Sequence, residues 1–149
     1  MLMKDRGLRV LVDTNVAYTY LSGRDDPYVS EAIGIMGLCS KKEIIGFLAF
    51  HSLPTIWYLG RKLSDDERRD MLMKLCNLLT VVGASHNEVI AAILNGDFRD
   101  FEDCLQDKCA KEAHCDYIVT ANVKDYAFSE IPAVTPDKLI AIWEERQKG

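Results

Sequence analysis

The stretch LRVLVDTNVAYTYLSG, residues 8–23, joins a short apolar run to a longer helical pattern. The run at residues 8–12 is typical of a strand that is buried on both faces, and residues 14–23 predict a helix that Gly23 closes. Asp13 lies at the junction of the two elements. A carboxylate there is either the N-cap of the helix or a functional group beyond the end of the strand. Taken alone, the position favours the N-cap, because Asp is common there.

The rest of the chain repeats this alternation of short apolar runs and helical patterns. Strands are predicted at residues 43–50, 79–83 and 116–120. Helices are predicted at residues 28–41, 52–63, 64–79, 85–95, 101–114 and 136–147, and a short apolar piece at 131–135 precedes the last one. Two capping boxes are expected, at Ser64 with Glu67 and at Ser85 with Glu88. Apolar strands that alternate with helices predict one domain over residues 1–149, a three-layer α/β/α sandwich with a central, mainly parallel sheet.

Composition and charge narrow the class of protein. No apolar run reaches the roughly 18 residues that a membrane helix needs, and the N-terminal MLMKDRG lacks the apolar core of a signal peptide. We therefore expect a cytoplasmic protein without a membrane partner. A formal net charge of −5 argues against general electrostatic attraction to nucleic acid, so any such contact needs local cations or a bound metal ion.

Cysteine usage points to core thiols. The five cysteines are an odd number, which argues against a disulfide framework. Cys104, Cys109 and Cys115, with His114 beside the last, have spacings that lack the short knuckle of a zinc site. Buried or half-buried thiols are the favoured interpretation.

Acidic and amide side chains gather in two further segments. DFRDFEDCLQD, residues 97–107, crowds acids at the start of a predicted helix, where they complement the helix dipole, and we expect Asp100, Asp103 and Asp107 to share one face. In TANVKDY, Thr120 ends a strand, and Asn122 and Asp125 follow in what could be an ordinary polar turn. Each segment alone has a structural explanation.

Together with Asp13, these segments predict a shared site. Functional groups of a parallel sheet gather beyond the carboxyl ends of the strands. Carboxylates that converge without His or Cys are suited to hard divalent cations such as Mg²⁺ or Mn²⁺. A bound cation of this kind activates water and offsets the charge of a phosphodiester.

The motifs VLVDTNV (10–16), DFEDCLQ (100–106) and DYIVTANVKDY (116–126), followed by IPAVTPDKLI (131–140), resemble those of PIN-domain nucleases, in particular the VapC-like toxins. The resemblance covers essentially the whole chain. It implies a metal-dependent endoribonuclease that uses Mg²⁺ or Mn²⁺ and leaves a 5′-phosphate and a 3′-hydroxyl on its RNA substrate. It also implies the toxin of a toxin–antitoxin pair, with an antitoxin protein as partner, and a homodimer.

The resemblance carries over to individual residues. Asp13 matches the first metal-site acid of the family, and Asp103 matches the later helix acid. Thr120 matches a hydroxyl near the site, and Thr14 and Asn15 match small polar residues that orient ligands. The predicted site residues are Asp13, Asp103, Asn122 and Asp125 for catalysis, with Asp13, Asp103 and Asp125 as metal ligands and Lys124 as a substrate contact.

Two positions depart from the family pattern. Thr55 stands where the second acid is usual, and Asn122 stands where the last acid is frequent, so Asp125 becomes the nearest carboxylate. These neutral residues leave a second hypothesis open, a catalytically weak or inactive PIN-fold module that binds RNA or protein. A response-regulator-like domain is disfavoured, because the third strand ends on Gly83 and Ala84 rather than on a phosphoacceptor Asp. His51 is either a general base or, as we favour, a hydrogen-bonded residue at a strand end.

Overall fold

The computed structural model describes residues 7–149, and its centre is a five-stranded sheet. The strands are β1 (Leu8–Val12), β2 (Ile44–Ala49), β3 (Thr80–Val82), β4 (Tyr117–Val119) and β5 (Ala133–Val134). Their order is β3-β2-β1-β4-β5, and every pair is parallel. Residues 1–6, on which the expectation of no signal peptide partly depends, lie outside the described residues.

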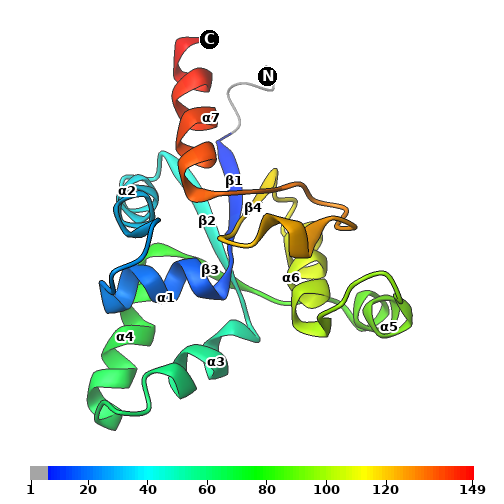
Figure 1. Cartoon of the computed structure of the whole chain (residues 1–149), viewed down its shortest axis with the longest axis horizontal. Coiled ribbons are helices and arrows are strands. Elements are labelled where there is room, and N and C mark those ends of the chain that lie inside the picture. The colour runs from blue at the N-terminus through cyan, green and yellow to red at the C-terminus, as the bar shows by residue number, and fades with distance from the viewer. Residues whose placement is uncertain (1–6) are drawn as a thin grey trace.

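Helices cover both faces of the sheet. They are α1 (Thr14–Ser22), α2 (Val29–Ser40), α3 (Ser52–Leu59), α4 (Asp65–Leu78), α5 (His86–Leu94), α6 (Phe101–Glu112), the 3₁₀ helix η2 (Val123–Tyr126) and α7 (Pro136–Lys148). Figure 1 shows α1, α2 and α4 on one side of the sheet and α5 and α6 on the other. The three-layer α/β/α arrangement with a parallel sheet is therefore confirmed.

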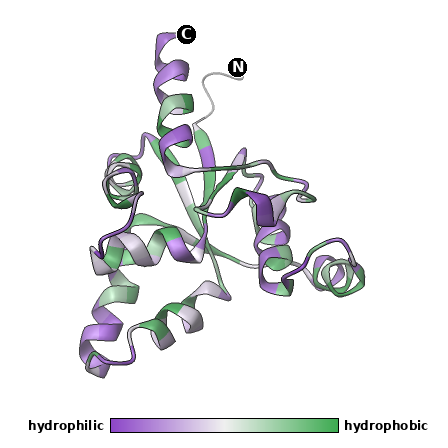
Figure 2. Ribbon diagram, in the orientation of Figure 1, coloured by the Kyte–Doolittle hydropathy of each residue, from purple (hydrophilic) through white to green (hydrophobic). Residues whose placement is uncertain are grey.

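The hydrophobic core has one part on each face of the sheet because side chains alternate along β1. Val10 and Val12 pack against α1, α2 and α4, whereas Leu11 packs against α6, and all three are fully buried. A strand buried on both faces is apolar throughout, which explains the continuous run at residues 8–12. Figure 2 shows the central strands as largely hydrophobic and the outer helices as mixed.

The structure refines several predicted boundaries. Helix α1 ends at Ser22, and Gly23 follows with a left-handed φ of 60°. Helix α3 ends at Leu59, four residues before the predicted end. The short apolar piece at 131–135 contains β5, which the sequence pattern did not predict as a strand.

One of the two predicted capping boxes is complete. Ser64 and Glu67 exchange both hydrogen bonds at the start of α4. The Ser85 hydroxyl accepts from the Glu88 backbone N–H, but the Ser85 N–H donates to the Glu112 carboxylate instead. The second box is therefore wrong, because a side chain from α6 takes the place of Glu88.

The cysteines are free thiols in this structure. Four of the five are buried, and Cys76 is exposed. Along residues 7–149, no helix is both long enough and apolar enough to cross a membrane.

Candidate functional site

Asp13 lies at the point where the order of the strands reverses. Strand β1 has β2 on one side and β4 on the other, and the chain runs from β1 directly into α1. Such a reversal leaves a crevice beyond the carboxyl ends of the two strands. The backbone N–H of Asp13 donates to the Val119 carbonyl at 3.0 Å, which fixes Asp13 to the end of β4.

Asp13 is the N-cap of α1 and also lies beyond the end of β1, beside the end of β4. As the N-cap of α1, its Oδ1 accepts from the Thr14 N–H at 2.7 Å. Its Oδ2 accepts from the Thr120 hydroxyl at 2.7 Å, across the gap to the end of β4. Burial raises the pKa of the Asp13 carboxyl, and the hydrogen bonds from Thr120 and Thr14 oppose that rise. The side chain is thus fixed in orientation and almost fully buried.

Behind Asp13, three buried polar side chains join α1, α3 and α6. The hydroxyls of Thr14 and Ser52 lie 2.7 Å apart, and the Gln106 amide donates to both, at 3.1 Å and 2.9 Å. Because all three are buried, each missing bond would leave an unsatisfied polar atom in the core. This network therefore sets the positions of the helices that carry the site.

Asp103 enters the crevice from the first turn of α6. Asp100 caps that helix and accepts from the N–H groups of Glu102 and Asp103, at 2.8 Å and 3.2 Å. The Tyr126 hydroxyl donates to Oδ1 of Asp103 at 3.3 Å. Burial, then the charges of Asp13, Asp100 and Asp125, raise the pKa of Asp103 to about 7.

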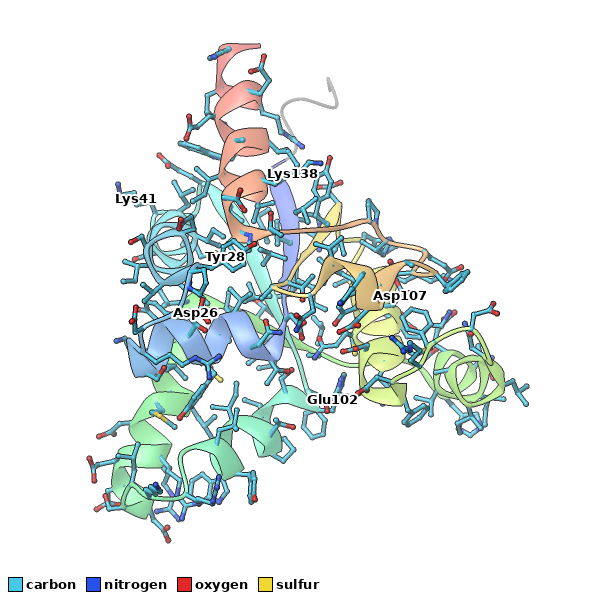
Figure 3. The ribbon with its side chains drawn as sticks, viewed as in Figure 1. Asp26, Tyr28, Lys41, Glu102, Asp107 and Lys138 are labelled. Carbon is cyan, nitrogen blue, oxygen red and sulfur yellow. The ribbon has the colours of Figure 1, made fainter. Side chains whose placement is uncertain are left out.

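These elements enclose an acidic cavity of about 360 Å³. Its lining includes five carboxylates, one guanidinium and several neutral polar groups: Asp13, Thr14, Asn15, Tyr18, Arg24, Thr55, Leu59, Asp100, Glu102, Asp103, Asn122 and Asp125. Figure 3 labels Glu102 at the start of α6, on the side that faces α3. A smaller cavity of about 250 Å³ shares Asp100, Asp103 and Asp125 and adds Arg99.

Most of the predicted site residues meet in this acidic cavity. Asp13, Asp103 and Asp125 line it together with Asn122 and Asn15. Thr120 lies behind the wall, fully buried, where its hydroxyl donates to Asp13 and accepts from the Asn122 N–H at 3.1 Å. Oδ1 of Asn15 is buried and has no hydrogen-bond partner.

Lys124 and Asp107 lie away from the cavity. Lys124 is exposed on η2 and does not line either acidic cavity. Asp107 accepts from the N–H groups of Glu130 and Ile131, both at 3.0 Å, and it is buried rather than in the cavity. Asp103 and Asp107 lie one turn apart on the same side of α6, because they are four residues apart in this helix, and Asp100 is its N-cap.

Thr55 has a carboxylate beside it after all. Burial and the nearby Asp100 raise the pKa of the Glu102 carboxyl, and the neighbouring Thr55 side chain opposes that rise. Glu102 thus brings negative charge from α6 to the part of the cavity where α3 has only a hydroxyl. From the sequence pattern, Glu102 is expected only to complement the dipole of α6.

Other contributors were also missed. Tyr126 belongs to the quoted KDY motif, but its role requires the 3₁₀ turn that aims its ring into the core. Arg24 follows a helix-ending glycine, a pattern with no functional signal of its own. His51 is as favoured, a strand-end residue whose Nε2 lies 3.3 Å from the Glu102 carbonyl oxygen, and burial lowers its pKa.

The donor set suits a hard divalent cation. The lining offers carboxylate and amide oxygens without thiolate or imidazole, and the carboxylates raise one another's pKa values, so a cation between them would relieve repulsion. Within residues 7–149, no three His, Cys, Asp or Glu side chains converge closely enough to hold an ion by themselves. Mg²⁺ commonly takes one or two carboxylates and keeps several waters, so two acids are a sufficient protein contribution.

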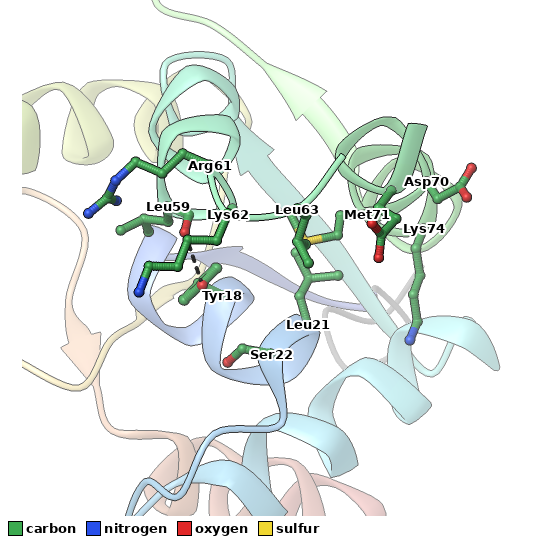
Figure 4. A pocket seen from close by; sticks show the side chains of 12 residues that line it. Tyr18, Leu21, Ser22, Leu59, Arg61, Lys62, Leu63, Asp70, Met71 and Lys74 are labelled. Carbon is green, nitrogen blue, oxygen red and sulfur yellow. Dashed lines mark hydrogen bonds between the residues drawn. The ribbon is translucent and has the colours of Figure 1, made fainter. Parts of the chain in front are cut away.

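A larger cavity of about 790 Å³ adjoins the acidic one and shares Tyr18 and Leu59 with it. Figure 4 shows its lining, with apolar groups from α1, α3 and α4 and charged groups at the rim. The Tyr18 hydroxyl donates to the Leu59 carbonyl at 3.3 Å, which joins α1 to the end of α3 at the boundary between the two cavities.

Comparison with known proteins agrees with this geometry. A family model described as PIN domain matches residues 9–124. Ribonuclease VapC1 of Aquifex aeolicus (strain VF5) is 27% identical over 141 residues, which cover 91% of this chain and 95% of that protein.

Solved structures share the fold. VapBC2 from Rickettsia felis, bound to a DNA fragment from its promoter, has a TM-score of 0.65 at 13% identity and covers 86% of this chain and 98% of that one. VapC20 from Mycobacterium tuberculosis, a toxin that cleaves the sarcin-ricin loop, has a TM-score of 0.56 at 17% identity, with 81% and 90% covered. FitAcB from Neisseria gonorrhoeae has a TM-score of 0.58 at 13% identity, with 85% and 97% covered.

Proposed function

Since the chain belongs to the PIN-domain family, we propose that it is a metal-dependent endoribonuclease and the toxin of a toxin–antitoxin pair. The observation that carries the proposal is the approach of Asp13 and Asp103 in the acidic cavity, each raised in pKa by its surroundings. Perturbed carboxylates that share a cleft are typical of functional sites.

Each acid has a defined part in this proposal. Asp13 and Asp103 hold Mg²⁺ or Mn²⁺ directly, and Asp125, on η2, lines the same cavity and acts on the cation through its bound water. Hydrogen bonds from Thr120 to Asp13 and from Tyr126 to Asp103 keep the two carboxylates in fixed orientations. The carboxylates therefore lose little conformational entropy when a ligand binds. When bound, the cation supplies an activated water and offsets the charge of the phosphodiester, so that hydrolysis leaves a 5′-phosphate and a 3′-hydroxyl.

The neutral polar residues of the cavity orient ligands and add no negative charge to the site. Asn122 and Asn15 present amide groups to the cavity, where they bind water or substrate oxygens. Glu102 supplies the negative charge that Thr55 lacks, because both side chains line the same cavity.

Partners follow from the relatives. The Aquifex relative is a ribonuclease by name, and the Mycobacterium protein is a toxin that cleaves the sarcin-ricin loop. The Rickettsia structure is a VapBC pair. We propose an RNA substrate, an antitoxin partner and a homodimeric, cytoplasmic protein of one domain.

A binding module that does not cleave RNA is the second candidate. Thr55 and Asn122 favour it, because neutral groups at these positions reduce the charge available to a metal ion. RNA binding without cleavage in any divalent cation would support this candidate over the nuclease.

The test is a cleavage assay on structured RNAs in Mg²⁺, in Mn²⁺ and in EDTA. We expect cleavage that EDTA abolishes and that Asp13→Asn and Asp103→Asn each reduce by roughly 100-fold or more. Asp66→Asn is the matched control, because Asp66 is exposed on α4 and its substitution by Asn also removes one negative charge. Equal cleavage by Asp13→Asn and the wild type would contradict the proposal.

A further inference from the structure

Arg24 is the only cationic residue among those that line the acidic cavity within the described chain. Five carboxylates surround the same space, and they repel an approaching phosphodiester. A cation at the edge of such a cavity therefore has a strong effect on which anions enter. Its position follows from the end of α1.

The turn at Gly23 folds Arg24 back over its own helix. The left-handed backbone of Gly23 directs its N–H to the Thr19 carbonyl at 3.1 Å, and the chain reverses there. Nε and Nη2 of Arg24 then both donate to the Thr19 hydroxyl, at 3.3 Å and 3.1 Å. Thr19 is buried, so the anchor of the guanidinium is rigid.

The plane of the guanidinium is held by an aromatic ring. Its central carbon lies 5.3 Å from the centre of the Tyr18 ring. The Tyr18 hydroxyl is in turn bonded to the Leu59 carbonyl, so α3 holds the ring in place. A guanidinium fixed by a hydroxyl and a ring loses little further freedom when it binds a ligand.

The charge of Arg24 is not used inside the protein. Among residues 7–149, Arg24 forms no ion pair with any carboxylate, although five of them line the same cavity. Its hydrogen-bond acceptor and its stacking partner are both neutral. The side chain therefore keeps its full charge and free N–H groups for an anion from outside.

We propose that Arg24 binds the RNA phosphate next to the metal site and so admits an anionic strand to a cavity that is otherwise negative. This inference rests on the proposed ribonuclease function for the identity of the anion. Arginine presents its donors in a fork that matches two phosphate oxygens, which a lysine at this position does not. Lys124, the predicted substrate contact, is not among the residues that line this cavity.

The test compares Arg24→Gln, Arg24→Lys and Arg69→Gln. Arg69 is exposed on α4 and does not line the cavity, so Arg69→Gln removes one positive charge at a site away from it. The probe is a short fluorescein-labelled RNA oligonucleotide, with Ca²⁺ in place of Mg²⁺, and its affinity is measured by anisotropy at several salt concentrations. Metal-supported cleavage, Mn²⁺ affinity and thermal unfolding are measured on the same variants.

We expect Arg24→Gln to weaken RNA binding and kcat/KM by roughly 10- to 100-fold, the effect of one charge-assisted phosphate contact. The slope of log affinity against log salt falls by about 0.7, the change expected for one lost contact to a single strand. Mn²⁺ affinity stays equal or rises, Arg24→Lys is intermediate, and Arg69→Gln matches the wild type.

A purely structural role for Arg24 predicts a different result. Arg24→Gln would then lower the unfolding temperature while the salt slope stays at the wild-type value, and that outcome overturns the inference. The proposed nuclease activity fails separately: if the wild type cleaves no RNA but binds it with an Arg24-dependent salt slope, the phosphate contact stands and the nuclease proposal does not.

Discussion

The Thr120 hydroxyl donates a 2.7 Å hydrogen bond to Oδ2 of Asp13, and this contact joins the ends of the neighbouring strands β1 and β4. Both residues are buried. We expect Thr120→Val, which keeps the shape of the side chain, to destabilise the protein by about 1.5–3 kcal/mol, because a buried carboxylate loses its strongest donor. Denaturant unfolding measures this change. Thr120→Ser keeps the hydroxyl and is the control, so equal losses in the two variants would assign the effect to packing instead.

The stability of the metal-free protein depends on pH through Asp103. Its pKa in the folded protein is about 7, against 3.8 for the free side chain, so the fold prefers the protonated acid. The contribution of Asp103 to stability is full below pH 3.8 and is lost as pH rises towards 7. Asp103→Asn removes this loss, and we expect a gain of about 1 kcal/mol, or roughly 2–4 °C, above pH 7, after allowance for solvent screening.

Thermal unfolding of the two proteins across this pH range measures the difference. The gain in unfolding temperature should vanish as pH falls towards 3.8. Saturating Mn²⁺ should raise the unfolding temperature of the wild type but not that of the variant. A variant that gains the same stability at every pH would show that the charge of Asp103 is not the cause.

Asp107 holds the loop that follows η2. Its carboxylate accepts from the backbone N–H groups of Glu130 and Ile131, and burial raises its pKa against those bonds. Asp107→Ala leaves both N–H groups without their acceptor, so we expect a loss of about 2–3 kcal/mol in urea unfolding. Asp107→Asn keeps one acceptor oxygen and should lose less. Equal stability of the alanine variant and the wild type would contradict this assignment.

Gly46 in β2 is required by a close approach of neighbouring side chains. A Cβ there would lie 2.5 Å from Cδ2 of Leu79 and 2.8 Å from Sγ of Cys39, both buried. We expect Gly46→Ala to cost about 1–3 kcal/mol. Gly37→Ala, on the exposed part of α2 with no atom within 4 Å, should instead stabilise by about 0.5–1 kcal/mol. Chemical unfolding of the pair separates crowding from helix propensity.

Sequence reasoning located the fold and the main acids because these depend on local patterns. The apolar run before Asp13 and the polar residues after Thr120 mark the ends of two strands, and parallel strands bring such ends together. Strand β5 was missed because two residues beside a proline have no periodicity, and only pairing with β4 makes them a strand.

The parts of the site that sequence reasoning missed depend on chain reversals. The 3₁₀ turn of η2 aims Tyr126 at Asp103, and the left-handed Gly23 folds Arg24 back to Thr19. Neither reversal has a sequence pattern that specifies where the following side chain points. Helical spacing places Asp107 on the same face as Asp103, but it does not predict that the loop at Glu130 and Ile131 packs against Asp107.

The most direct test of the account is calorimetric titration of Mn²⁺ into the wild type, Asp13→Asn, Asp103→Asn and the exposed control Asp66→Asn. Asp13 and Asp103 are the proposed ligands, so we predict that each of their variants weakens binding by at least roughly 10-fold while Asp66→Asn binds as the wild type does. Four equal dissociation constants, or no Mn²⁺ binding by the wild type, would contradict the claim that these two carboxylates form a metal site.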